Sequence, residues 1–141
     1  MNPRKILIVD DSPVILKAFS TKLRVKGYEV ITAPDGSSAV STARQHKPDL
    51  IILDISFPPD VEHGGGVPWD GFLILDWIRR LEMEKTPPVI IVTGGDPAKY
   101  KERALAAGAV GFFQKPVNPD ELVAAIQHAL GDAPPAAQPP A

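Results

Sequence analysis

Short apolar runs, each followed closely by a polar residue, recur along the chain with a helix-sized interval between them. The four clearest runs and the polar residues behind them are Ile6–Val9 with Asp10 and Asp11, Leu50–Leu53 with Asp54, Val89–Val92 with Thr93, and Val110–Phe113 with Lys115. Apolar runs of strand length that alternate with segments of helical period predict βαβ units and a parallel sheet. Carboxyl ends of parallel strands share one sheet edge, so we expect these polar side chains to converge on one crevice, where open α/β sheets place their ligands.

The segments between the runs carry the start and stop signals of helices. A first helix is predicted from Ser12-Pro13, a cap residue followed by proline, to Lys26-Gly27. A weaker strand over Tyr28–Thr32 and the turn signal Pro34-Asp35-Gly36 lead into a short helix that ends near Gln45. Further helices are predicted over 70–84, 97–107 and 119–130, with Pro87-Pro88 ending the first of these.

Two segments interrupt this alternation. Residues 57–69 contain three prolines and the run Gly64–Gly66, which is typical of a long loop. Residues 132–141 consist almost entirely of proline and alanine with no large apolar side chain, and we interpret them as a disordered tail or a truncated linker. The sequence therefore predicts one domain over 1–131 followed by this tail.

Composition narrows the classes of function. The length of 141 residues fits one domain. The net charge is −2 and no run of Lys or Arg is long enough to follow a phosphate backbone, so direct nucleic-acid binding is not expected. The absence of cysteine excludes disulfides and thiol catalysis. No apolar stretch has the length of a signal peptide or a membrane span, which predicts a cytoplasmic protein without a membrane partner.

The converging side chains favour phosphoryl chemistry. Asp10, Asp11 and Asp54 would repel one another in a partly desolvated crevice unless a cation neutralised them. Mg²⁺ takes oxygen ligands and commonly joins carboxylates to phosphoryl oxygens. Lys115 and Thr93 offer a positive charge and a hydroxyl to the remaining phosphoryl oxygens, and a carboxylate can itself act as the nucleophile and form an aspartyl phosphate.

The ordered set of motifs resembles the receiver domain of two-component response regulators. The matching segments are Ile6–Ser12, Ala33–Gly36, Pro48–Asp54, Asp70-Gly71, Ile91–Gly94 and Gly108–Pro116. Each segment alone is weakly diagnostic, because a lone Asp at a strand end is more often a turn or cap residue, but the set spans about residues 4 to 130. The resemblance implies a doubly wound five-stranded parallel sheet in the flavodoxin-like order 2-1-3-4-5, with about five helices in a three-layer sandwich.

The resemblance also implies a role for each matching residue. Asp54 would accept the phosphoryl group, and Mg²⁺ would be held by Asp10, Asp11, Asp54 and the backbone carbonyl of Ser56, with Asp10 acting partly through water. Lys115 would pair with Asp54 and then with the phosphoryl oxygen. Thr93 would turn inward on phosphorylation, and Phe112 occupies the aromatic switch position, although this phenylalanine is also expected to be partly core. The peptide bond between Lys115 and Pro116 would be cis.

By the same resemblance, the chain would be a signalling switch and not a turnover enzyme. The phosphodonor would be a histidine kinase or a histidine phosphotransfer protein, and the domain would slowly hydrolyse its own phosphate. Residues 97–130, which contain the fourth helix, the fifth strand and the fifth helix, would form the face that docks a downstream protein effector. The sequence leaves homodimerisation and a truncated effector domain open.

The loop after Asp54 departs from the family pattern, since Asp70-Gly71 arrives about nine residues later than expected. We interpret residues 59–69 as an insertion beside the site. It either shapes access for the phosphodonor or binds a dedicated partner, with Trp69 as the anchor, or it is a mobile glycine-rich excursion with Trp69 packed against the third helix.

Three alternative functions share part of this pattern. A haloacid-dehalogenase-type phosphotransferase also uses an aspartyl nucleophile, but it needs a second Asp two positions after the first, where this chain has Ser12. A flavodoxin-like cofactor binder needs a phosphate loop rich in Ser, Thr and Gly, and Asp10 and Asp11 would repel the flavin phosphate. A receiver-like interaction module that no longer accepts phosphate is disfavoured because every required polar group is present.

Overall fold

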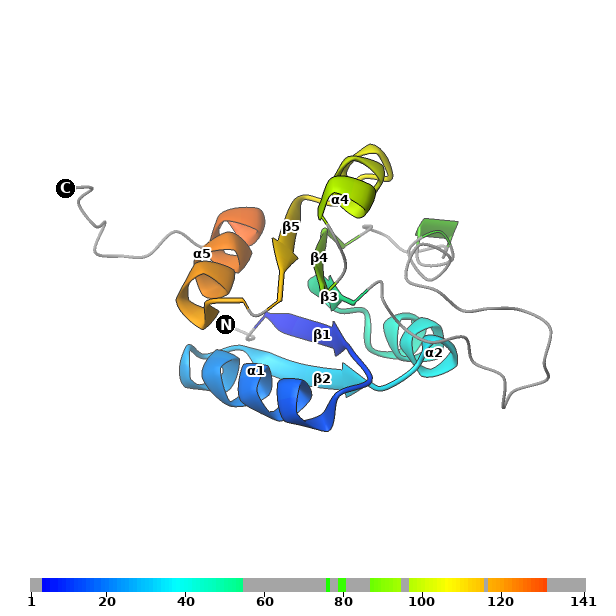
Figure 1. The fold of residues 1–141 in the computed structure, drawn as a ribbon. Helices are drawn as coiled ribbons and strands as arrows, with labels where there is room; N and C mark the ends of the chain where they lie inside the picture. Colours follow the sequence, from blue (N-terminus) through cyan, green and yellow to red (C-terminus); the bar gives the residue numbers. More distant parts are fainter. Residues whose placement is uncertain are drawn as a thin grey trace.

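A computed structural model of the chain describes residues 4–54, 76, 79–80, 87–94, 97–115 and 117–131 (Figure 1). The five strands are β1 (Lys5–Val9), β2 (Glu29–Ala33), β3 (Leu50–Leu53), β4 (Val89–Thr93) and β5 (Gly111–Gln114). They form one parallel sheet in the order β2-β1-β3-β4-β5. This order confirms the predicted doubly wound fold class.

Four helices have defined bounds among the described residues: α1 (Pro13–Val25), α2 (Gly36–His46), α4 (Pro97–Ala106) and α5 (Pro119–Leu130). Asp76, Arg79 and Arg80 are also helical and fall within the helix predicted over 70–84, whose other residues lie outside the described part of the chain. Figure 1 shows α1 and α5 on one face of the sheet and α2 and α4 on the other. The architecture is therefore the expected three-layer sandwich.

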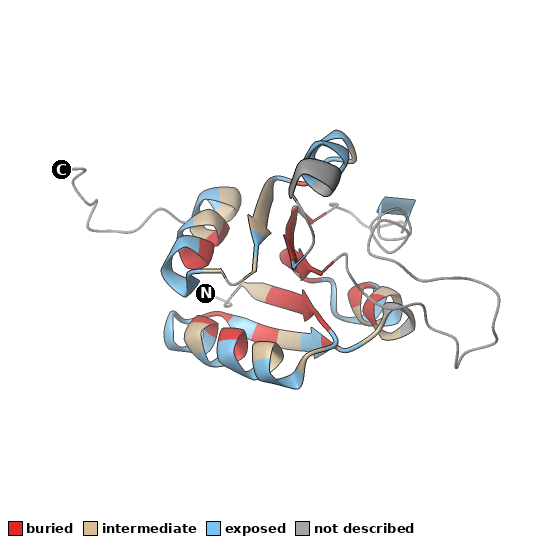
Figure 2. Cartoon of the chain, in the orientation of Figure 1, coloured by how far each residue is buried: buried red, intermediate tan, exposed pale blue. Residues whose placement is uncertain are grey.

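Alternating strand residues supply the two halves of the core (Figure 2). One half joins Leu7, Val9, Ile51, Leu53 and Ile91 to the small residues Ala39, Ala43 and Ala104 of α2 and α4. The other half joins Ile6, Ile8, Ile52, Ile90 and Val92 to Phe19 and Leu23 of α1 and to Leu122 and Ile126 of α5. The central strands β1, β3 and β4 are covered on both faces, which explains why their sequences are continuously apolar.

The helix ends follow local sequence signals. α1 and α5 each begin with a polar N-cap, Ser12 and Asn118, whose side chain accepts a backbone N–H and which is followed by proline. α5 ends at Gly131 with a φ of 75°, a left-handed conformation that glycine adopts readily. α2 ends instead at Lys47, whose φ of 51° is unusual for a residue with a side chain.

Two strands are shifted by one residue from their predicted positions. β2 covers Glu29–Ala33 where Tyr28–Thr32 was predicted, and β5 covers Gly111–Gln114 where Val110–Phe113 was predicted. Val110 is 55% exposed, although its backbone N–H donates to the carbonyl of Val89 at 2.9 Å. The apolar character of Val110 therefore misplaces the start of β5, because this valine does not face the core.

Candidate functional site

The polar residues of interest lie at the carboxyl edge of the sheet, and main-chain hydrogen bonds hold them there. The N–H of Asp54 donates to the carbonyl of Val9 at 3.0 Å, and the N–H of Lys115 donates to the carbonyl of Thr93 at 2.9 Å. The N–H of Asp10 donates to the carbonyl of Ala33 at 3.2 Å, so the pairing between adjacent strands continues one residue beyond β1 and β3. These main-chain hydrogen bonds fix the backbone positions from which the side chains of Asp10, Asp54 and Lys115 extend.

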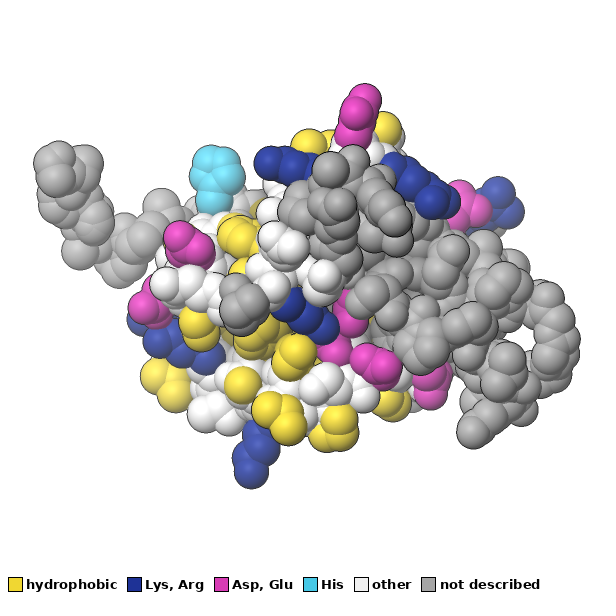
Figure 3. Space-filling model, viewed as in Figure 1, with side chains coloured by type: hydrophobic (Ala, Val, Ile, Leu, Met, Phe, Trp, Pro, Cys, Tyr) yellow, Lys and Arg dark blue, Asp and Glu magenta, His cyan; other side chains and the backbone are white. Residues whose placement is uncertain are grey.

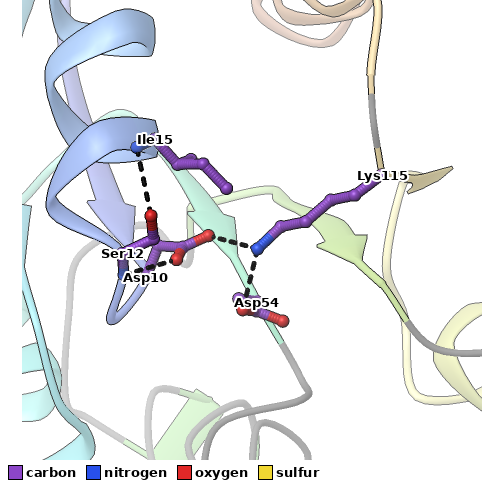
Figure 4. A network of polar contacts seen from close by, with 5 residues as sticks. All are labelled: Asp10, Ser12, Ile15, Asp54 and Lys115. Atoms are coloured by element: carbon purple, nitrogen blue, oxygen red, sulfur yellow. Dashed lines mark hydrogen bonds and ion pairs between the residues drawn. The ribbon is translucent and has the colours of Figure 1, made fainter.

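Lys115 bridges two carboxylates that come from two different strand ends (Figure 4). Its Nζ lies 2.8 Å from Oδ2 of Asp10 and 3.1 Å from Oδ2 of Asp54. The side chains of both aspartates are almost completely buried, with exposed fractions of 4% and 3%. A single ammonium group is thus shared by two buried carboxylates.

Asp11 adds a third carboxylate on the solvent side. One oxygen from each of Asp10, Asp11 and Asp54 lies within 4.8 Å of the other two, and Asp11 is exposed while the other two are buried. Figure 3 shows acidic side chains gathered beside a basic one near the centre of this face. Three converging carboxylates form the all-oxygen donor set that suits a hard divalent cation such as Mg²⁺.

Burial and the contacts with Lys115 act on the pKa of Asp10 and of the lysine itself. Burial raises the pKa of Asp10, and the nearby charge of Asp54 adds to this, although Lys115 and the N–H of Ser12 act in the opposite direction. Burial alone would lower the pKa of Lys115, but hydrogen bonds to Asp10 and Asp54 outweigh that effect and raise it. Lys115 therefore stays protonated, and its ammonium group is shared by Asp10 and Asp54.

Thr93 and Phe112, the two residues of the predicted switch, lie on the neighbouring strands β4 and β5. Thr93 ends β4 and is fully buried, and it pairs in register with Gln114 of the neighbouring strand. Phe112 pairs with Ile91 and is half-buried against the alanine-rich half of the core. The hydroxyl of Thr93 and the ring of Phe112 are thus carried by adjacent strands.

Comparison with known proteins identifies the family. A family model for the response regulator receiver domain matches residues 6–127. The chain belongs to this family. Receiver domains serve as signalling switches in two-component systems and bind Mg²⁺ at an acidic pocket, and this receiver domain has a cluster of three aspartates that could hold a metal ion.

Relatives of two kinds resemble this receiver domain. The transcriptional regulatory protein KdpE of Mycobacterium tuberculosis is 35% identical over 125 residues, which cover 89% of this chain and 50% of KdpE. The polar-differentiation response regulator DivK of Brucella anthropi is 30% identical over 131 residues, covering 93% of this chain and 99% of DivK. The chain thus spans about half the length of KdpE but nearly the whole of DivK.

Solved structures agree with the fold. The chemotaxis response regulator CheY4 of Vibrio cholerae superposes with a TM-score of 0.77 at 34% identity, covering 92% of this chain and all of CheY4. A CheY-like receiver domain from Methanospirillum hungatei superposes with a TM-score of 0.78 at 27% identity, covering 93% and 96% of the two chains. Among the residues that the structure describes, no helix has both the length and the apolar character of a membrane span.

Several predicted site elements lie outside the described residues. These are Ser56, the insertion at 59–69 with Trp69, Pro116 in the predicted cis peptide, and the tail at 132–141. Asp10, Asp11, Asp54, Thr93 and Lys115 are all described, and the structure places them at the same edge of the sheet.

Two features of the site were missed by the sequence analysis. Lys115 was expected to pair with Asp54, but it also contacts Asp10, at the shorter distance. The N–H of Ser12 donates to Oδ1 of Asp10 at 2.9 Å, where only a helix cap was expected at this serine. The spacing of Asp10 and Ser12 could have indicated this bond, because Asp side chains commonly accept from the N–H two residues on.

Proposed function

We propose that this receiver domain is phosphorylated on Asp54 in a Mg²⁺-dependent reaction and acts as a phosphorylation-controlled protein switch. The observation that carries this proposal is the arrangement of three carboxylates within 4.8 Å of one another, with Lys115 bonded to two of them. A cluster that served only to stabilise the fold would not need two carboxylates buried around a single ammonium group, since burying charged groups costs free energy.

The roles of the side chains in phosphoryl transfer follow from their positions. A carboxylate oxygen of Asp54 attacks phosphorus, the bond from phosphorus to the imidazole nitrogen of the donor breaks, and the imidazole keeps the electron pair and takes up a proton. Asp10, Asp11 and Asp54 would hold Mg²⁺, together with the carbonyl of Ser56. When bound, Mg²⁺ would neutralise the charge that develops on the phosphoryl oxygens. Lys115, already at Asp54, moves onto a phosphoryl oxygen without leaving the site.

The switch follows from the charge that phosphorylation adds. A phosphoryl group brings nearly two negative charges and new acceptor oxygens next to Lys115 and Thr93. Thr93 donates to the phosphoryl oxygen, and Phe112 on the adjacent strand adjusts its packing against the core cluster. The face built from α4, β5 and α5 responds to this change and alters its affinity for a protein effector.

The proposed partners are a histidine kinase or histidine phosphotransfer protein as donor and a protein effector as target. Homodimerisation of the phosphorylated form is one route for the output. Trp69 in the insertion is proposed as an anchor for one of these partners. We place the protein in the cytoplasm, do not expect direct contact with nucleic acid, and expect slow hydrolysis of the aspartyl phosphate in place of rapid turnover.

Incubation with acetyl phosphate and Mg²⁺, followed by intact-mass measurement, tests the proposal. The wild type should gain one phosphoryl group, and chelation of Mg²⁺ or the substitution Asp54→Ala should abolish the gain. Asp120→Asn, which removes an exposed carboxylate on α5, is the matched control and should behave as wild type. Catalytic release of phosphate over many turnovers would favour the haloacid-dehalogenase alternative, and an unmodified wild type would favour an interaction module.

A further inference from the structure

We infer that Ser12 is a positioning residue for the cation site, because it ties the first turn of α1 to the carboxylate of Asp10. This inference rests on the proposed function of Asp10 as a Mg²⁺ ligand. Ser12 touches neither the nucleophile nor Lys115 in the network of Figure 4, so it would act through Asp10 alone.

A continuous chain of hydrogen bonds connects the helix to the site. The N–H of Ile15 donates to Oγ of Ser12 at 3.3 Å, and the N–H of Leu16 donates to the carbonyl of Ser12 at 3.0 Å. The N–H of Ser12 donates in turn to Oδ1 of Asp10 at 2.9 Å. The orientation of residue 12, and therefore of its N–H, is thus set by the cap of α1.

Asp10 is held at both carboxylate oxygens. Oδ1 accepts from Ser12 and Oδ2 accepts from Lys115. Two contacts at different oxygens define the plane of the carboxylate, whereas one contact leaves it free to rotate. A cation bound at this edge would change the contacts between Lys115 and the carboxylates. The hydrogen bond from the N–H of Ser12 to Oδ1 of Asp10 need not change when the cation binds.

The backbone of residue 12 is suited to this task. Its φ of −91° and ψ of 113° are extended, as expected for an N-cap and for a residue that precedes proline. Pro13 has no N–H, so the contact between the side chain of Ser12 and the N–H of Ile15 carries the cap. Loss of the hydroxyl loosens the first turn and, with it, the donor to Asp10.

The chain contains a matched control for this inference. Asn118 caps α5, is also followed by proline, and accepts from the N–H of Asp120 at 2.8 Å and of Glu121 at 3.4 Å. Among the described contacts, Asn118 has no bond to a carboxylate of the cation site. Asn118→Ala therefore removes a comparable cap from the same fold without touching Asp10.

The test compares Ser12→Ala, Ser12→Thr, Asn118→Ala and Asp10→Asn with the wild type. Calorimetric titration with MgCl₂ gives the dissociation constant. Amide hydrogen exchange at residue 12, measured in EDTA, reports directly on the N–H that contacts Asp10. Ser12→Ala should weaken Mg²⁺ binding by up to about fivefold, the equivalent of one N-cap, and should reduce amide protection at residue 12 by a similar factor. Ser12→Thr, which keeps the hydroxyl, should restore both.

The controls separate this inference from its premise. Asn118→Ala should destabilise the fold as much as Ser12→Ala while leaving Mg²⁺ affinity unchanged. If both cap variants alter Mg²⁺ affinity equally, or if residue 12 stays as protected in Ser12→Ala as in wild type, the positioning role is wrong. If wild type and Asp10→Asn both fail to bind Mg²⁺, the proposed cation site is wrong, and the amide exchange measurement still decides whether Ser12 holds Asp10.

Discussion

Replacement of Lys115 by methionine removes the ammonium group that lies between Asp10 and Asp54. Nζ of Lys115 is 2.8 Å and 3.1 Å from the two carboxylates, which are almost completely buried. At an effective dielectric constant of about 20, each attraction amounts to roughly 5–6 kcal/mol before the loss of hydration is subtracted. Removing one partner of a buried ion pair costs about 3–5 kcal/mol. Because Lys115 itself is 20% exposed and water reaches this edge, we expect about 3 kcal/mol.

Urea unfolding followed by circular dichroism in EDTA measures this cost. With a slope of about 2 kcal/mol per M urea, the midpoint of Lys115→Met should fall by about 1.5 M. Saturating MgCl₂ should stabilise the variant more than the wild type, because a bound cation supplies the charge that the lysine no longer provides. Lys22→Met removes an exposed ion pair with Asp120 and should change stability by less than about 0.5 kcal/mol.

Equal midpoints for wild type and Lys115→Met in EDTA would refute this reasoning, because the two carboxylates would then not depend on the lysine. Equal stabilisation of both proteins by Mg²⁺ would refute the further step, in which the cation and the lysine compensate the same negative charge.

Three further substitutions test other features. The folded state raises the pKa of Asp10 above its ordinary value of 3.8, so ionisation of this carboxyl group lowers the stability of the protein above the folded pKa. Asp10→Asn should therefore stabilise the protein at neutral pH in EDTA. This gain in stability should vanish as the pH falls through the folded pKa towards 3.8. Thermal unfolding across pH measures the effect, and a gain that persists at low pH would contradict it. Ser20 is buried, and its Oγ has no hydrogen-bond partner among the described residues, so Ser20→Ala should raise the free energy of unfolding by about 1 kcal/mol in urea titrations, whereas a loss would indicate a bound water or partner. Lys47→Gly should stabilise the protein by about 0.5–1 kcal/mol, because Lys47 adopts a φ of 51° at the end of α2; an unchanged urea midpoint would show that the entropy of glycine offsets the relief of strain.

Much of the fold could be predicted because short local sequence patterns mark its strands and the starts of its helices. Continuous apolar runs identify β1, β3 and β4, whose burial on both faces removes any need for polar residues. Ser12-Pro13 and Asn118-Pro119 mark the starts of α1 and α5. Prediction was weaker at the edge strands β2 and β5, since one side of each is open and apolar residues such as Val110 need not face the core.

The membership of the site could also be predicted, but its internal geometry could not. Parallel strands bring Asp10, Asp54 and Lys115 to one edge whatever their side-chain conformations. Lys115 lies closer to Asp10 than to Asp54 because of the direction that its side chain takes across the sheet. The sequence alone does not indicate that direction. The contact of Ser12 with Asp10 depends on the turn between β1 and α1, where two overlapping patterns, a cap and an Asp turn, share the same residue.

The order of the strands has a consequence for synthesis of the protein on the ribosome. Asp10 and Asp54 follow β1 and β3, which pair early in the chain, whereas Lys115 directly follows β5, the outermost and last strand of the sheet. A nascent chain that has emerged only as far as β4 carries Asp10 and Asp54 but not yet Lys115. A chain released before residue 115 would therefore lack the ammonium group that pairs with Asp10 and Asp54.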